Sequence, residues 1–243
     1  MAEPSIQVVA DGAAVAAAAA ERIIQLSDAA ITSRKIFSIA LSGGNTPRAL
    51  FELLSSPPYT RRTNWKAWEI YFSDERCVGP DDEQSNFRMA RQTLLDRVPV
   101  DPQKIHRMVG EIDPQQAAKQ YGQLLKEKFG DGGMDVILLG MGDDGHTASL
   151  FPGSAALNET QHRCVANFVP KLNTWRITMT APFINRAAEV MVLVEGAAKA
   201  ARVAEVLHGP RDPQRLPIQL IEPNPGRMLW IMDTAAAGMD KLD

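Results

Sequence analysis

Residues 135–153, DVILLGMGDDGHTASLFPG, place a histidine and a carboxylate directly behind a short apolar run. The run at 135–139 has the composition of a buried parallel strand, and Gly142 belongs to the glycine-rich turn behind it. Such strands commonly open into a ligand crevice at their carboxyl ends. Histidine is the side chain best suited to proton transfer near neutral pH, and Asp144 precedes His146 by two residues. The spacing indicates an acid–base site; a structural histidine in a tight turn is the alternative.

A second candidate site lies at 41–54, LSGGNTPRALFELL, where an apolar strand runs into a helix that we expect to start at Pro47. Glycines let the backbone approach a ligand closely, and a helix N-terminus offers free N–H groups and a positive dipole end. The spacing matches neither a P-loop nor the dinucleotide-binding fingerprint. A plain strand–turn–helix connection capped by Thr46 is the alternative. The residues expected to line a sugar or a phosphate here are Gly43, Gly44, Asn45 and Thr46.

Charged residues follow a third apolar strand, in YFSDERCVG at 71–79. Arg76 carries the planar guanidinium that suits bidentate contact with phosphate, and Asp74 is placed to orient a substrate hydroxyl or the histidine. Arg176, at the start of RITMT, and Lys199, in VLVEGAAKA, could complete an anion pocket. Each of these charges could equally lie on a solvated surface.

Strands and helices alternate along the chain. Apolar runs predict strands at 5–10, 36–41, 68–72, 135–139, 164–169, 176–180, 189–194 and 228–232, and periodic segments predict helices at 12–34, 47–54, 86–95, 114–129 and 197–207. Residues 73–85 read as an irregular polar segment. This order predicts an α/β fold, with a mostly parallel twisted sheet covered by helices on both faces. Because the carboxyl ends of parallel strands share one edge, we expect the three motifs to meet at one crevice.

Composition narrows the function classes. A chain of 243 residues fits a single catalytic α/β domain over 1–243, with room for a small inserted subdomain. The net charge of −3 argues against a nucleic-acid partner, and no apolar stretch is long enough to span a membrane. Cys77 and Cys164 match no zinc spacing, so we expect no metal site, two free thiols and a cytoplasmic protein. A monomer is the default expectation, since no interface stripe is visible in the sequence.

The motifs SGGNTP, SDER with the downstream SNFRMA, and GMGDDGHTASLFPG resemble those of the glucosamine-6-phosphate isomerase/6-phosphogluconolactonase family, and in particular its lactonases. The resemblance runs from about residue 5 to residue 235. It implies the Rossmann-type fold of these sugar-phosphate enzymes. It also implies hydrolysis of 6-phospho-D-glucono-1,5-lactone to 6-phosphogluconate, in the oxidative pentose phosphate pathway, without a metal or organic cofactor.

The resemblance also implies roles for the candidate residues. His146 falls on the general base and Asp144 on its neighbouring carboxylate. Arg76 falls on a substrate-phosphate contact, and Arg176 and Lys199 are expected to be further phosphate contacts. The turn at 43–46 falls on the sugar-lining loop, and N–H groups of the turns at 43–46 or 142–145 are expected to face the developing oxyanion.

Two other functions remain as alternatives. A glucosamine-6-phosphate deaminase needs an additional acid–base residue, and in the deaminase pattern a glutamate follows the histidine closely. Here TASLFPG follows His146, and no acidic residue occurs before Glu159, which favours the lactonase. A non-catalytic sugar-phosphate-binding module would keep Arg76 and the turn at 43–46, but would have little reason to keep His146 beside Asp144.

Overall fold

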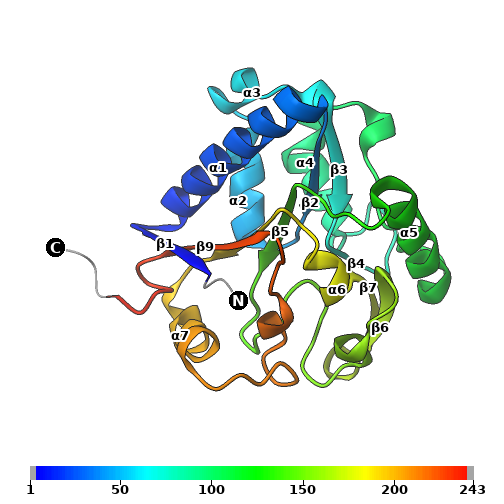
Figure 1. Ribbon diagram of the computed structural model, residues 1–243, viewed down its shortest axis with the longest axis vertical. Coiled ribbons are helices and arrows are strands. Elements are labelled where there is room, and N and C mark those ends of the chain that lie inside the picture. The colour runs from blue at the N-terminus through cyan, green and yellow to red at the C-terminus, as the bar shows by residue number, and fades with distance from the viewer. Residues whose placement is uncertain (1–3, 240–243) are drawn as a thin grey trace.

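A six-stranded, fully parallel sheet forms the centre of the molecule (Figure 1). The structure is a computed structural model that describes residues 4–239. The strands of the central sheet, in their spatial order, are β1 (Ser5–Val9), β9 (Arg227–Asp233), β8 (Glu189–Val194), β5 (Val136–Gly140), β2 (Phe37–Leu41) and β3 (Trp68–Phe72). All five residues of β2 and all six of β8 are buried, as expected for parallel strands covered on both faces.

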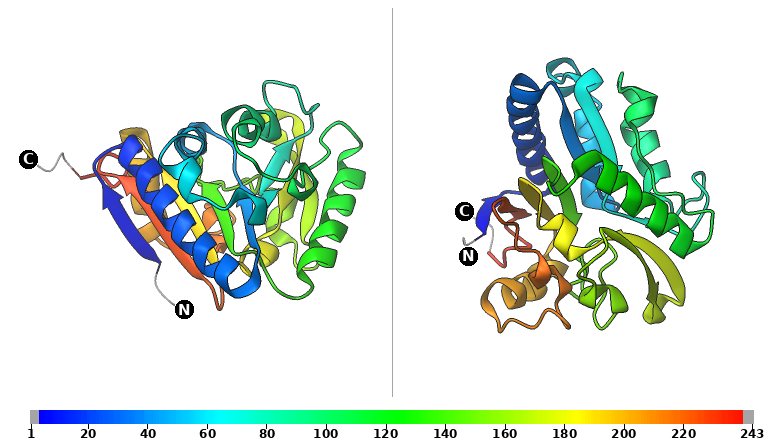
Figure 2. Two further views of the ribbon diagram at one scale, coloured as in Figure 1. Left: turned by 90° about the horizontal axis from the view of Figure 1, so that it is seen from above. Right: turned by 45° about the vertical axis from the view of Figure 1, so that its right-hand side comes forward.

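Helices cover both faces of this sheet, and each face has its own core. The helices are α1 (Gly12–Arg34), α2 (Asn45–Leu54), α3 (Tyr59–Arg62), α4 (Asn86–Thr93), α5 (Pro114–Phe129), α6 (Ala181–Ile184) and α7 (Ala200–His208). Apolar residues of α1, α2 and α4 pack with Phe37, Ile39 and Leu41 of β2 on one face. Residues of α5, α6 and α7 share the other core, to which β2 contributes Ala40. The period of two along the strand thus divides its side chains between two helical layers, which the second view of Figure 2 shows on either side of the sheet.

A second, three-stranded sheet lies beside the central one and has the order β4 (Asp74–Arg76), β7 (Thr174–Met179) and β6 (Cys164–Val169). Both pairings in this sheet are antiparallel. A short connection joins β6 to β7, and such a connection can form only an antiparallel hairpin. The segment β4 lies within the polar stretch 73–85 that we expected to be irregular. That expectation is wrong for residues 74–76, which acquire strand structure by pairing with a strand about 100 positions further along the chain, and it holds for residues 77–85.

The strand order reverses between β2 and β5. The chain runs outward from β2 to β3 on one side, whereas β5 and β8 lie on the other side. In doubly wound sheets, ligands bind outside the carboxyl ends of the strands at such a switch point. The glycine-rich turn behind β2 and the histidine turn behind β5 both lie there.

The α/β fold expected from the sequence is confirmed, with a mostly parallel sheet and helices on both faces. Within residues 4–239, no helix combines the length and the apolar character that crossing a membrane requires.

Candidate active site

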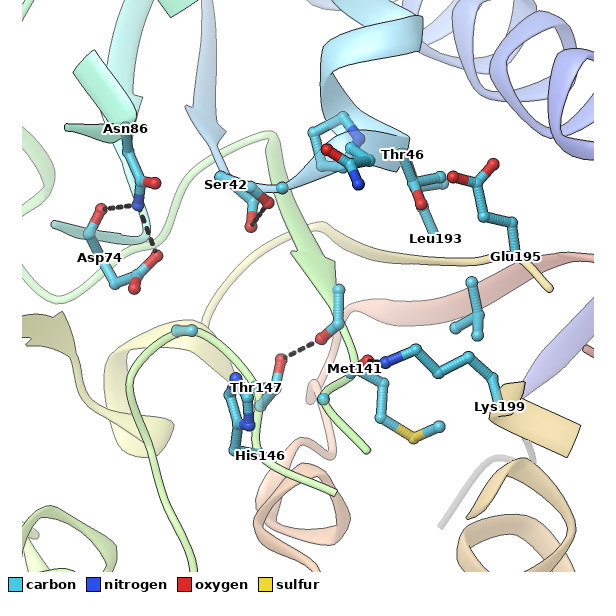
Figure 3. A pocket seen from close by; sticks show the side chains of 18 of the residues that line it. Ser42, Thr46, Asp74, Asn86, Met141, His146, Thr147, Leu193, Glu195 and Lys199 are labelled. Atoms are coloured by element: carbon cyan, nitrogen blue, oxygen red, sulfur yellow. Dashed lines mark hydrogen bonds between the residues drawn. The ribbon is translucent and has the colours of Figure 1, made fainter. Parts of the chain in front are cut away.

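The carboxyl ends of β2, β3 and β5 surround a cavity of about 370 Å³, which Figure 3 shows at close range. A second cavity of about 300 Å³ adjoins it, and both cavities are lined by Asp74, Arg76, His146 and Ala148. The predicted residues that line the larger cavity are Gly43, Gly44, Asn45, Thr46, Asp74, Arg76, Gly142, His146 and Lys199. Asp144 and Arg176 line the smaller cavity. The structure therefore brings all the predicted site residues together, with His146 where the two cavities meet.

The turn behind β2 presents the N-terminus of α2 to the larger cavity. The helix begins at Asn45 rather than at Pro47, and Gly44 is its N-cap residue, with a φ of 107°. Thr46 therefore lies in the first turn and is not the cap, and among the described residues no side chain caps the helix. Since the first N–H groups of a helix have no partner within it, this end offers backbone donors to a ligand.

Gly43 has a different structural reason to be glycine. A Cβ placed on Gly43 would lie 1.9 Å from Oδ1 of Asn86. The buried side chain of Asn86 therefore occupies the volume that any larger residue at position 43 would need. This close approach joins the turn behind β2 to the start of α4.

His146 is held against the backbone of its own turn. Gly142 N–H donates to His146 O at 2.9 Å, and Gly145 N–H donates to Gly142 O at 3.0 Å. These two N–H groups, which the sequence suggests as donors to an oxyanion, are therefore used within the turn. The imidazole stacks on Phe151, with ring centroids 4.1 Å apart and planes inclined by 20°. Two local constraints thus orient the ring toward the junction of the cavities.

The imidazole of His146 forms a close pair with Asp144. Nδ1 of His146 lies 2.6 Å from Oδ1 of Asp144, and Nζ of Lys171 lies 3.3 Å from Oδ2 of the same carboxylate. Burial opposes ionisation of Asp144, but hydrogen bonds from His146 and Lys171 outweigh it and lower the pKa of this carboxyl. An ionised carboxylate can only accept, so it selects the tautomer with the proton on Nδ1. Nε2 is then left as a proton acceptor.

Successive charged side chains of β4 point to opposite faces of the strand. Asp74 and Arg76 line both cavities, whereas the intervening Glu75 points to the start of α4. There Glu75 accepts hydrogen bonds from the N–H groups of Asn86 and Phe87, at 2.7 and 2.8 Å. The local cause is the period of two in a strand. Asp74 and Arg76 are thereby assigned to the site, and Glu75 to the support of a helix.

Arg76 and Arg176 lie directly opposite each other in the antiparallel pair β4–β7. Like charges in such positions are unfavourable, and within residues 4–239 neither guanidinium has a carboxylate within salt-bridge distance. Burial, and then the charge of Arg76, lower the pKa of Arg176. Two close guanidinium groups at a cavity wall are a suitable environment for a doubly charged anion.

Lys199 approaches the larger cavity from another side. Its Nζ donates to Met141 O at 3.0 Å and forms an ion pair with the exposed Asp143. Lys199 does not line the smaller cavity, and Figure 3 shows it across the cavity from Asp74. The three predicted cations therefore form two groups, the arginine pair and Lys199.

Several residues that build the site carry no local signal of their role in the sequence. Asn86, Ser149 and Phe151 belong to the quoted motifs, but their partners are distant in sequence or depend on the shape of the turn. Lys171 lies in no motif, and only the β6–β7 hairpin brings it to Asp144. Within residues 4–239, no group of three or more His, Cys, Asp or Glu side chains is arranged to hold a metal ion.

A sequence model described as glucosamine-6-phosphate isomerases/6-phosphogluconolactonase matches residues 10–230, which is most of the chain. The chain belongs to this family. The resemblance stated from the three motifs is thereby confirmed.

Relatives within the family are similar over nearly their whole length. A 6-phosphogluconolactonase of Nostoc sp. strain PCC 7120 is 37% identical over 96% of this chain and 96% of its own. One of Synechocystis sp. strain PCC 6803 is 40% identical over 85% of this chain and 86% of its own. The solved structure of 6-phosphogluconolactonase from Trypanosoma cruzi superposes with a TM-score of 0.86 at 28% identity, and covers 97% of this chain and 96% of its own.

Proposed function

We propose that this protein hydrolyses 6-phospho-D-glucono-1,5-lactone to 6-phosphogluconate. The observation that carries the proposal is the position of His146, which is paired with Asp144 and lies where a sugar-sized cavity meets an arginine-lined one. The relatives named as 6-phosphogluconolactonases support the same substrate class. The reaction belongs to the oxidative pentose phosphate pathway, and we place it in the cytoplasm.

The proposed chemistry begins with a water molecule at Nε2 of His146. The imidazole takes a proton from this water as its oxygen bonds to C1 of the lactone, and the carbonyl electrons move to the exocyclic oxygen. General-base assistance of this kind contributes roughly 10²–10⁴-fold to the rate. Asp144 keeps Nδ1 protonated and stabilises the imidazolium. When the C1–O5 bond breaks, the imidazolium returns the proton to O5.

The oxyanion on C1 needs hydrogen-bond donors that are free in the resting site. Because Gly142 and Gly145 use their N–H groups within their own turn, we propose that the donors are those of the N-terminus of α2, at Asn45 and Thr46. Loss of one oxyanion donor costs about 10²–10³-fold in other enzymes. Gly43 and Gly44 of the same turn line the sugar. Asp74 accepts a hydrogen bond from one of the hydroxyl groups of the sugar.

The phosphate needs positive charge away from the reacting carbon. We propose that Arg76 and Arg176 bind it, since each is half-buried and neither has a salt bridge within the described residues. Lys199 is proposed as a further contact to the charged end of the substrate. Binding energy from this remote group holds the lactone in the geometry of attack.

The decisive experiment measures proton release from freshly oxidised glucose 6-phosphate, with the spontaneous opening of the lactone subtracted. The wild type should accelerate hydrolysis. His146→Ala should lose the acceleration by roughly 10²–10⁴-fold and still bind 6-phosphogluconate in calorimetry. Near-normal turnover by His146→Ala would remove this residue from the mechanism.

Release of ammonia from glucosamine 6-phosphate tests the deaminase alternative. We expect none, because Glu159, the next acidic residue after His146, lies outside both cavities and lines a separate hollow beside α5. There it accepts hydrogen bonds from the N–H groups of Gln161 and His162. Robust release of ammonia would assign the protein to the deaminases instead.

A further inference from the structure

Ser149 connects the histidine turn to Asp74. Its Oγ donates to Oδ2 of Asp74 at 2.6 Å, across 75 positions of sequence. Ser149 is 1% exposed and Asp74 is 6% exposed, so water does not compete freely for this contact. Ser149 lies three residues after His146, in the adjoining turn that the bond from Leu150 N–H to Thr147 O closes at 2.9 Å. A single hydroxyl therefore links the segment that carries the imidazole to the strand that carries the carboxylate.

The backbone of Ser149 is fixed independently of that hydroxyl. Its N–H donates to Oγ1 of Thr178 at 3.2 Å, and its carbonyl accepts from Nδ2 of Asn167 at 2.9 Å. Thr178 and Asn167 are themselves buried residues of the second sheet. The side chain of Ser149 thus projects from an anchored backbone.

The carboxylate of Asp74 receives two donors from different elements. Asn86 donates from its Nδ2 to Oδ1 at 3.2 Å, and Ser149 donates to Oδ2 (Figure 3 shows the Asn86 contact). Two donors on different oxygens fix the plane of a carboxylate, whereas one donor leaves it free to rotate. The remaining acceptor directions belong to the cavity that Asp74 lines.

We infer that Ser149 is a positioning residue. It holds the Asp74 carboxylate, the group proposed to accept a hydrogen bond from a sugar hydroxyl, at a fixed position relative to His146. This inference rests on the proposed function and adds to it. Ser149 is among the residues around the smaller cavity, but only 1% of it is exposed and its hydroxyl is bonded to Asp74, so it acts through Asp74 rather than by contact with the lactone. A hydrogen bond from a hydroxyl to a charged group contributes enough to alter turnover measurably.

Ser149→Ala removes the donor and leaves the backbone contacts in place. We expect kcat/KM for the phosphorylated lactone to fall about tenfold, since Asn86 still holds the other oxygen. Ser27→Ala is the matched control, because Ser27 is a buried serine of α1, away from both cavities, and its Oγ accepts from Nε1 of Trp68 at 2.8 Å. The control loses a comparable buried contact without touching Asp74, so its kcat/KM should stay within twofold of the wild type.

A double-mutant cycle with Asp74→Ala, which removes the partner of the Ser149 hydroxyl altogether, separates positioning from a general loss of structure. If Ser149 acts through Asp74, Ser149→Ala in the Asp74→Ala background should lower kcat/KM by less than twofold. Thermal unfolding of all variants verifies that they are folded at the assay temperature. If Ser149→Ala does not fold, Ser149→Cys keeps a side chain of similar size and a weaker donor, and should show a smaller loss that also disappears in the Asp74→Ala background.

The outcomes separate the two proposals. A wild type that does not accelerate lactone hydrolysis would overturn the proposed function. An active wild type, with Ser149→Ala no more impaired than Ser27→Ala, would overturn the inference alone. Equal losses from Ser149→Ala in the presence and absence of the Asp74 carboxylate would do the same.

Discussion

The imidazole of His146 occupies the volume that a side chain on Gly142 would need. A Cβ built on Gly142 would lie 2.0 Å from Nδ1 of His146 and 2.1 Å from its Cε1. Nδ1 is also the atom that contacts Asp144. The absence of a side chain at position 142 is therefore a condition for the geometry of the candidate base.

Gly142→Ala should consequently displace the imidazole and separate it from Asp144. We expect kcat to fall by about 10²-fold, since misplacement by an ångström is costly in catalysis. Gly79→Ala is the control, because a Cβ at Gly79 meets no atom of residues 4–239 within 4 Å, and this variant should keep full activity. Steady-state kinetics of both variants on the lactone makes the comparison. Wild-type kcat in Gly142→Ala would show that the ring tolerates the displacement.

Asp144→Asn should lower kcat by roughly 10²–10⁴-fold at pH 7, because an amide no longer enforces the Nδ1-protonated tautomer. Steady-state kinetics on the lactone measures this loss.

The effect of Asp144→Asn on the free energy of unfolding should be larger at neutral pH than at acidic pH. The pKa of Asp144 is lowered in the folded protein, so its ionised form stabilises the fold above the pKa of the unfolded chain. This contribution is lost as the pH falls through the lowered value.

Urea unfolding of the wild type and of Asp144→Asn tests that dependence. The difference in unfolding free energy should be about 1–2 kcal/mol at pH 7 and should shrink below pH 4. A difference that grows on acidification would contradict a lowered pKa for Asp144.

The phosphate assignment is tested by comparing two lactones. Arg76→Met should raise KM for 6-phosphogluconolactone by roughly 10–100-fold and leave kinetics on unphosphorylated D-glucono-1,5-lactone nearly unchanged. Lys199→Met in the same assay measures the contribution of Lys199. We expect it to reduce the preference for the phosphorylated over the unphosphorylated lactone less than Arg76→Met does. If Lys199→Met abolishes the preference for the phosphorylated lactone and Arg76→Met does not, the phosphate lies on the Lys199 side of the larger cavity.

Gly43→Ala should act on the site through Asn86. The added methyl group would overlap Oδ1 of Asn86 and push that side chain away from Asp74. We expect a loss of about 1–3 kcal/mol in unfolding free energy, as for other overpacked sites, and a lower kcat/KM. Chemical denaturation and lactone kinetics measure both effects. Full retention of both would mean that Asn86 yields without disturbing Asp74.

Local patterns in the sequence were sufficient to predict the parallel sheet and the helices that cover it. Apolar runs of strand length and segments of helical period recur in the chain, and the strand ends carry the glycines and charges that later meet. Such signals are local, because a strand or helix shows its period within a few residues. The crevice at the carboxyl ends of β2, β3 and β5 follows from the parallel topology, and the sequence predicted it.

The first residue of α2 was predicted incorrectly from the sequence. Pro47 suits a first helical turn, and Thr46 is a common cap, yet the helix begins at Asn45 behind a glycine in the left-handed region. Sequence spacing is compatible with either start. The φ of Gly44 decides between them, and it depends on how the turn packs against its surroundings.

Sequence alone determined which residue types reach the edge of the sheet, and tertiary structure decided which of them touch. The pairing of Arg76 with Arg176 and the contact of Ser149 with Asp74 join positions 100 and 75 residues apart. No local period encodes such contacts, because they arise only when a three-residue strand finds its partner across the folded chain. Because side chains alternate along β4, Asp74 and Arg76 face the cavities and Glu75 faces the start of α4. This division depends on the pairing of β4 with β7.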